Sequence, residues 1–177
     1  PLVATLAMLP VIVAGILLGT GAGAAMGFAA GLFSFIVWTF MPPNPVTAFV
    51  FTPTAAPGNF WSLVICFVPR ILTGVVASLM FKLLSRLLDG KKGATGVIYA
   101  VSGVLGSLTN TLLVMGGIYV FFGKSYATAM DISFNLLLGI IGTTILTNGV
   151  LEAIVGGLVA CGVCIPMKKM MRRTLPL

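Results

Sequence analysis

The sequence is poor in charged residues and has few of the side chains that face water in a soluble protein. Only 7% of its 177 residues are charged, whereas about 25% is usual for a soluble domain. So few polar groups cannot cover a surface that faces water, and the mean hydropathy of +1.17 has the same consequence. The composition therefore excludes a soluble globular domain and predicts an integral membrane protein.

The side chains that serve acid–base and metal chemistry are nearly absent. There is no histidine, and the three acids, Asp89, Asp131 and Glu152, lie at different depths and cannot act as a pair. Cys161 and Cys164 form a CxxC pair, but no second pair exists to complete a zinc site. We interpret these cysteines as small packing residues. The sequence thus predicts no catalytic residue, no metal site and no enzyme activity.

A phosphate-binding loop is also missing. Gly123-Lys124-Ser125 resembles the end of such a loop, but the position that needs its first glycine is Ile118, and no strand precedes it. We therefore expect the chain to bind no cofactor and not to hydrolyse ATP itself.

Five long apolar runs dominate the chain. They lack the alternation of a membrane β-barrel, and a transmembrane helix needs about 20 residues. They predict an all-α bundle of transmembrane helices in a single domain over residues 1–177. The runs are Val3–Leu18, Gly23–Phe40, Phe60–Leu84, Gly96–Phe122 and Ile132–Pro166.

The basic residues predict the orientation. Eight of them lie around one connection or after the last run: Lys82, Arg86, Lys91, Lys92, Lys168, Lys169, Arg172 and Arg173. The opposite face has only Lys124. Cytoplasmic loops are enriched in such cations, so we expect a multi-pass protein of the cell membrane with a cytoplasmic C-terminus. The net charge of +7 could suggest a nucleic-acid-binding protein, but cations at the ends of apolar runs are typical of a membrane protein instead. Five spans put Pro1 outside, and one further span before it, six in all, would return the start to the cytoplasm.

The connection at residues 41–59, MPPNPVTAFVFTPTAAPGN, has five prolines and no charge. Because proline fixes φ and removes a hydrogen-bond donor, we expect an extracellular loop without a helix. Such a loop either folds over a cavity as a lid or lies in the membrane interface.

Five glycines recur at every fourth position: Gly15, Gly19, Gly23, Gly27 and Gly31. Residues four apart share one face of a helix, and a face without side chains lets another helix approach closely. We expect this ridge to be the contact surface for a partner protein. The alternative is packing between helices of this chain.

Arg70 is the most costly residue in the sequence. It follows Phe60 by ten positions, which places it about 15 Å into the bilayer, where an arginine costs about 2.5–3.5 kcal/mol and normally faces a cavity or a partner. Asn110 and Asn148 reach a similar depth, so we expect a polar pocket that opens outward. The alternative is a structural pair between Arg70 and Glu152, one turn beyond Asn148.

The order of these segments resembles the substrate-binding S component of an energy-coupling factor (ECF) vitamin transporter. The resemblance rests on "LVATLAMLPVIVAGILLG", "GFAAGLFSFI", the proline-rich loop, "FVPRILTGVVASLMFKLL" and "TNGVLEAIVGGLVACGV". It implies six helices and a substrate cavity near the outer face. It also implies two kinds of partner, a transmembrane T component and two cytoplasmic ATPases that bind the ATP. The competing interpretation is a membrane scaffold protein that transports nothing.

The vitamin follows from the charge of the pocket. Arg70 favours an anion such as pantothenate, biotin or folate over neutral riboflavin, and the pattern is most similar to pantothenate S components. We expect Arg70, Asn110 and Asn148 to bind the substrate, with Trp61 and Tyr119 near the outer ends of their helices. S components for riboflavin, folate or biotin remain alternatives.

Overall fold

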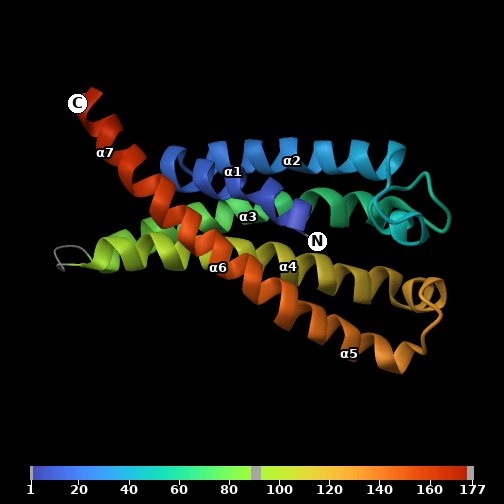
Figure 1. Ribbon diagram of the computed structural model, residues 1–177. Coiled ribbons are helices and arrows are strands. Elements are labelled where there is room, and N and C mark those ends of the chain that lie inside the picture. Colours follow the sequence, from blue (N-terminus) through green and yellow to red (C-terminus); the bar gives the residue numbers. More distant parts are fainter. Residues whose placement is uncertain (1, 89–92, 175–177) are drawn as a thin grey trace.

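The computed structural model describes residues 2–88 and 93–174, and its regular secondary structure there is entirely helical (Figure 1). This confirms the predicted all-α membrane bundle. The elements in chain order are α1 (Leu2–Leu18), α2 (Thr20–Phe40), the 3₁₀ helix η1 (Pro45–Val50), α3 (Phe60–Leu87), α4 (Ala94–Ala129), α5 (Phe134–Thr144), the π-helical turn η2 (Ile145–Gly149), α6 (Val150–Val159), the π-helical turn η3 (Ala160–Cys164) and α7 (Ile165–Thr174).

Four helical segments of the described chain are long and apolar enough to cross a membrane. They are α2, α3, α4 and the segment Phe134–Met171, in which α5, η2, α6 and η3 run into α7. The shorter α1 packs beside α2 and α3 (Figure 1). Each apolar run of the sequence therefore corresponds to a helix. The fourth helix continues past Phe122 to Ala129, since Lys124 and Ser125 do not interrupt a helix.

The helices α1 and α2 form a tight hairpin through Gly19. This residue has a φ of +97°, a conformation that glycine adopts without the steric cost of a Cβ. No atom would lie within 4 Å of a Cβ placed on Gly19. Its contribution is therefore the turn and not a packing contact.

The rest of the glycine ridge packs inside the chain, as the alternative interpretation of these glycines predicts. Gly23, Gly27 and Gly31 are buried in α2. A Cβ on Gly23 would lie 2.7 Å from the carbonyl oxygen of Gly74 in α3, and one on Gly15 or Gly27 would collide with the α3 backbone. The backbone of α3 occupies the smooth face, because two apolar helices gain contact area when they meet along small residues.

The loop at residues 41–59 contains a short helix, contrary to the expectation from its prolines. Pro45 stands in the first turn of η1, where a helix needs no N–H donor. The side chain of Asn44 accepts a hydrogen bond from the Val46 N–H at 3.0 Å and so caps this turn.

The same loop is packed onto the end of the bundle. Phe49 and Val50 are buried in one apolar cluster with Ile65 of α3 and with Val114, Ile118 and Phe122 of α4. The hydroxyl of Ser62 donates a hydrogen bond to the Phe49 carbonyl oxygen at 2.6 Å and also accepts one from the Asn59 N–H at 3.1 Å. The loop and the first turn of α3 are thus one folded unit.

Small residues also bring α4 and the last helical segment together. A Cβ on Gly103 would collide with the Gly156 carbonyl oxygen, and Cys161 donates from its thiol to the Gly96 carbonyl oxygen at 3.2 Å. Cys161 and Cys164 are both free thiols. Their place in a helix seam agrees with the interpretation as packing residues.

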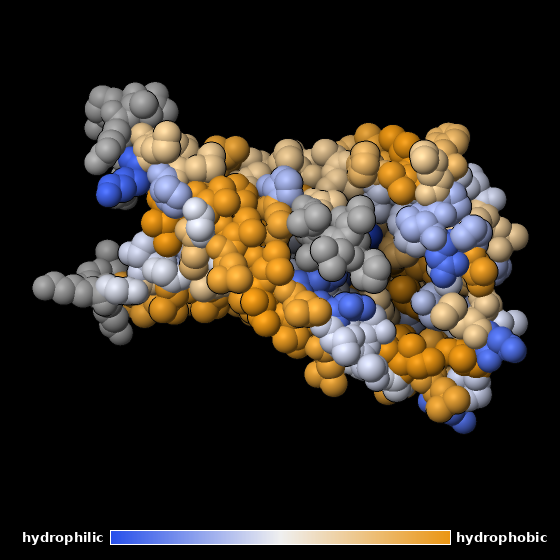
Figure 2. All heavy atoms as spheres, in the orientation of Figure 1, coloured by the Kyte–Doolittle hydropathy of each residue, from blue (hydrophilic) through white to orange (hydrophobic). Residues whose placement is uncertain are grey.

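The outer surface is largely apolar (Figure 2). Large hydrophobic side chains such as Phe33 on α2, Leu138 on α5 and Leu158 on α6 are more than half exposed. Exposed apolar area on this scale suits contact with lipid chains. In Figure 2, hydrophilic residues interrupt this surface midway along the bundle.

Candidate functional site

Arg70 is buried in the middle of α3, with 6% of its surface exposed. Its Nη1 donates a hydrogen bond to the carbonyl oxygen of Ile65 at 2.7 Å. That carbonyl lies four residues before Pro69, which has no N–H to offer it. The guanidinium therefore takes the acceptor that the proline leaves without its usual helical donor.

A pair of stacked aromatic rings lies beside the guanidinium. The Cζ of Arg70 lies 5.3 Å from the centre of the Phe51 ring, and the ring of Trp38 stacks on Phe51 at 4.6 Å. A cation on a ring face gains about 0.5–2 kcal/mol, with the larger values where water is excluded. The proline-rich loop, α2 and α3 thus converge on Arg70.

The guanidinium is not fully satisfied by these contacts. Its Nε is buried and has no hydrogen-bond partner in the part of the chain that the structure describes. Buried polar groups are nearly always paired, so such an atom calls for an explanation. A ligand that accepts a hydrogen bond from Nε would supply one.

Asn110 of α4 has the complementary property. Its Oδ1 is likewise buried without a partner among the described residues. The next residue, Thr111, touches the last helical segment: its methyl group lies 3.2 Å from the position of a Cβ on Gly149. Asn148 precedes that glycine in η2 and is partly buried. The contact between α4 and η2 therefore lies beside both predicted asparagines.

Glu152 belongs to a hydrogen-bonded seam between α4 and α6. Its Oε2 accepts a hydrogen bond from the Thr111 hydroxyl at 2.6 Å, and its main-chain carbonyl oxygen accepts one from Ser107 at 3.0 Å. The carboxylate is near enough to act electrostatically on Arg70. Thr111 is therefore a direct hydrogen-bond partner of the carboxylate, a contact that sequence reasoning did not anticipate.

Trp61 and Tyr119 lie in aromatic stacks of their own. Trp61 stacks on Phe121 of α4 with ring centres 4.0 Å apart, and Tyr119 stacks on Phe134 of α5 at 5.6 Å. The ring that lies over Arg70 is Phe51, and Trp38 stacks on that ring. The sequence offered one signal for this, the apolar stretch Ala48–Phe51 inside a proline-rich loop, which is hard to reconcile with a solvated connection.

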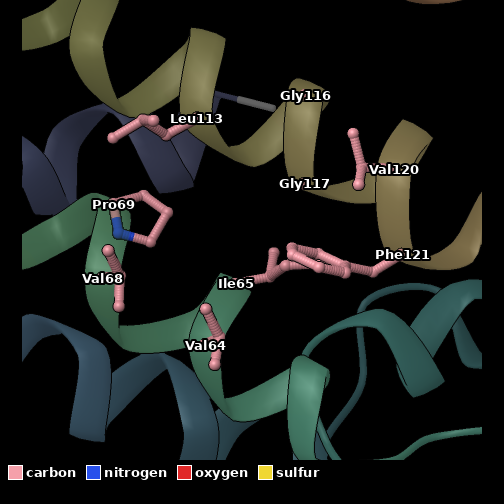
Figure 3. A pocket seen from close by; sticks show the side chains of 9 residues that line it. All are labelled: Val64, Ile65, Val68, Pro69, Leu113, Gly116, Gly117, Val120 and Phe121. Carbon is pink, nitrogen blue, oxygen red and sulfur yellow. The ribbon is translucent and has the colours of Figure 1, made fainter.

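An apolar cleft of about 200 Å³ lies between α3 and α4 (Figure 3). Figure 3 shows Val64, Val68 and Pro69 of α3 facing Val120 and Phe121 of α4 across it. The full lining is Val64, Ile65, Val68, Pro69, Leu113, Gly116, Gly117, Val120 and Phe121. Such a lining offers an anion no hydrogen bond. Arg70 adjoins this cleft, because its Nη1 bonds the carbonyl oxygen of the lining residue Ile65 and because it follows the lining residue Pro69 in the chain.

Comparison with known proteins places this chain in a family. Residues 1–164 match the family described as ECF transporter, substrate-specific component. The chain is 34% identical over 165 residues to the "Pantothenic acid transporter PanT" of Lactococcus lactis subsp. cremoris (strain MG1363), an alignment that covers 87% of this chain and 79% of that protein. No solved structure gives a significant match. The chain therefore belongs to the substrate-specific components of ECF transporters, and it is a multi-pass membrane protein of a transport system.

Proposed function

We propose that this chain is the vitamin-binding S component of an ECF transporter that takes up pantothenate. The observation that carries the proposal is the buried Arg70, whose Nε has no hydrogen-bond partner among the described residues. The other nine of the ten basic residues lie toward helix ends and connections. A relative that is 34% identical is named as a pantothenic acid transporter, and this supports the choice of vitamin.

The chemistry of pantothenate fits the polar groups of Arg70 and Asn110. The vitamin carries one carboxylate, two hydroxyls and an amide. A guanidinium recognises a carboxylate through charge-assisted hydrogen bonds, and the unpartnered Oδ1 of Asn110 accepts from a hydroxyl or an amide N–H. In this proposal Asn148 adds polar contacts, and the apolar surroundings of Phe51 and Trp38 exclude water and so strengthen the ion pair.

The energy for uptake comes from other subunits in this proposal. A transmembrane T component and two cytoplasmic ATPases form the transporter with this chain, and the ATPases bind the ATP. The C-terminus and the connection between α3 and α4 lie in the cytoplasm, with the proline-rich loop outside. The distribution of the basic residues supports this orientation.

Calorimetry on the purified chain tests the ligand. We expect tight binding of pantothenate and no measurable binding of biotin, folate or riboflavin at the same concentrations. Tight binding of another of these vitamins would replace pantothenate in the proposal.

Uptake tests the transport role. Cells that express the chain together with a T component and both ATPases are expected to accumulate labelled pantothenate. Cells in which the ATPases carry inactive catalytic sites are expected not to. A protein that binds none of the vitamins and supports no uptake would favour the scaffold interpretation.

A further inference from the structure

Pro69 and Arg70 are linked through a single carbonyl group. In an α-helix the N–H of residue 69 would donate to the carbonyl oxygen of residue 65. Proline has no N–H, so this bond cannot form. The Nη1 of Arg70 donates to the same oxygen at 2.7 Å, and both partners are buried.

This bond constrains the orientation of the guanidinium. Nη1 is held at the Ile65 carbonyl, and Cζ lies over the Phe51 ring. The edge that carries Nε has a buried donor without a partner in the part of the chain that the structure describes. A planar guanidinium presents parallel donors along an edge, and a carboxylate matches that spacing.

We propose that Pro69 is a positioning residue for anion recognition. By leaving the Ile65 carbonyl oxygen without a helical donor, it anchors Nη1 and directs the Nε edge of Arg70 at the carboxylate of the ligand. This inference rests on the proposed function and deepens it. It explains why a proline, which is unfavourable within a helix, stands directly before the arginine.

A purely structural role for Pro69 predicts something different. Pro69 also lines the apolar cleft between α3 and α4, so its removal alters packing there. A change in packing has no reason to distinguish a charged ligand from a neutral one. The discriminating measurement is therefore the ratio of affinities for two ligands that differ only at the carboxylate.

Pro69→Ala supplies that test. Alanine restores the N–H at position 69, which then competes with Arg70 for the Ile65 carbonyl oxygen. Affinities are measured for pantothenate and for panthenol, in which a CH₂OH group replaces the carboxylate. We expect Pro69→Ala to weaken pantothenate binding about tenfold and to leave panthenol binding within about twofold.

Three further variants sharpen the result. Pro69→Val restores the same N–H with more volume in the cleft and is expected to behave like Pro69→Ala. Pro166→Ala removes an exposed proline from α7 and is expected to change neither affinity. In an Arg70→Ala background, Pro69→Ala is expected to have no further effect on pantothenate, because coupled residues are not additive.

Each outcome decides the matter. A pantothenate-to-panthenol ratio that stays at the wild-type value would overturn the role of Pro69, as would an equal loss for both ligands or a full effect of Pro69→Ala without Arg70. Wild-type protein that binds neither ligand would overturn the proposed function, and this inference with it.

Discussion

At the scale of single residues, the chain places a cation within the membrane, and the contacts described for it do not use all of its hydrogen-bond donors. Arg70 has one backbone acceptor and one aromatic face, and its Nε has no partner among the described residues. Glu152 acts on it electrostatically while its own Oε2 accepts from Thr111. These two charges therefore differ in what we expect of them, ligand binding for Arg70 and helix packing for Glu152.

Arg70→Ala tests the first expectation. Removing one partner of a buried charge pair costs about 3–5 kcal/mol, so pantothenate affinity is expected to fall by a factor of about 100 or more. Arg70→Lys is expected to recover only part of it, since an ammonium lacks the planar fork. Calorimetry and thermal unfolding are run on the same samples.

The competing structural pair predicts the opposite pattern. There, Arg70→Ala and Glu152→Gln would lower the melting temperature comparably and leave the affinity of the folded protein unchanged. Normal pantothenate affinity in Arg70→Ala would exclude the ligand role.

Thr111→Val tests the second expectation. Hydrogen bonds between membrane helices average about 0.6 kcal/mol, whereas bonds to charged groups contribute about 1.5–3 kcal/mol. The acceptor here is a carboxylate. We therefore expect Thr111→Val to lower the free energy of unfolding by about 1.5–3 kcal/mol, measured by thermal unfolding in detergent.

The matched control is Thr109→Val. The Thr109 hydroxyl donates to the Leu105 carbonyl within α4 at 2.7 Å, so valine removes no contact between helices. An equal loss of stability in the two variants would show that the bond to Glu152 adds nothing special.

At the scale of elements, the fold depends on backbones that meet without intervening side chains. The main seam joins α2 to α3 through Gly23, Gly27 and Gly74, and a second joins α4 to α6 through Gly103 and Gly156. The proline-rich loop is a third kind of contact, in which Phe49 and Val50 anchor a connection to the core. Because Phe51 follows these anchors directly, the loop holds its ring near Arg70.

Gly27→Leu is expected to prevent folding of the bundle. A side chain at this position meets the backbone of Arg70 and Ile71, which cannot move aside as a flexible side chain would. Ala25→Leu, on the exposed face of the same helix, is the control and is expected to fold normally. Size-exclusion chromatography in detergent distinguishes them.

This comparison also bears on the partner surface. A Gly27→Leu protein that is monodisperse, binds pantothenate and fails only to assemble with a T component would support the partner role of the ridge. We expect loss of folding and of binding together.

At the scale of the whole molecule, the distribution of charge predicts how the bundle sits in the membrane. Arg86 lies in the last turn of α3, and Lys124 is exposed near the opposite end of α4. Lys91 and Lys92, which contribute to the same prediction, lie outside the described residues. With Arg86 in the cytoplasm, the proline-rich loop, whose Phe51 ring lies over Arg70, would be on the outside.

Cysteine labelling tests this orientation. In a background with Cys66, Cys161 and Cys164 replaced by alanine, Lys124→Cys is expected to react with an impermeant maleimide on intact cells. Arg86→Cys is expected to react only after the membrane is opened. The reverse pattern would place the pocket on the cytoplasmic side and contradict uptake from outside.

The sequence by itself determined the class of the protein and the positions of its long helices. Apolar runs of bilayer length form helices, because in hydrocarbon the backbone N–H and C=O groups must hydrogen-bond within their own segment. It also singled out Arg70, since a cation within the bilayer has an energetic cost that a surface cation does not have. The family resemblance, carried by the order of glycine, proline and apolar segments, was confirmed by the comparison.

Only the tertiary structure decided what those residues contact. Small residues every four positions suit an internal seam and a partner surface equally well, so the sequence could not choose α3 as the occupant of the ridge. The approach of Phe51 to Arg70 depends on how a loop folds back across the bundle, and no periodicity encodes that. Hydropathy and spacing were sufficient to predict helices, because the bilayer requires them. They could not predict which segments, distant in sequence, pack against each other.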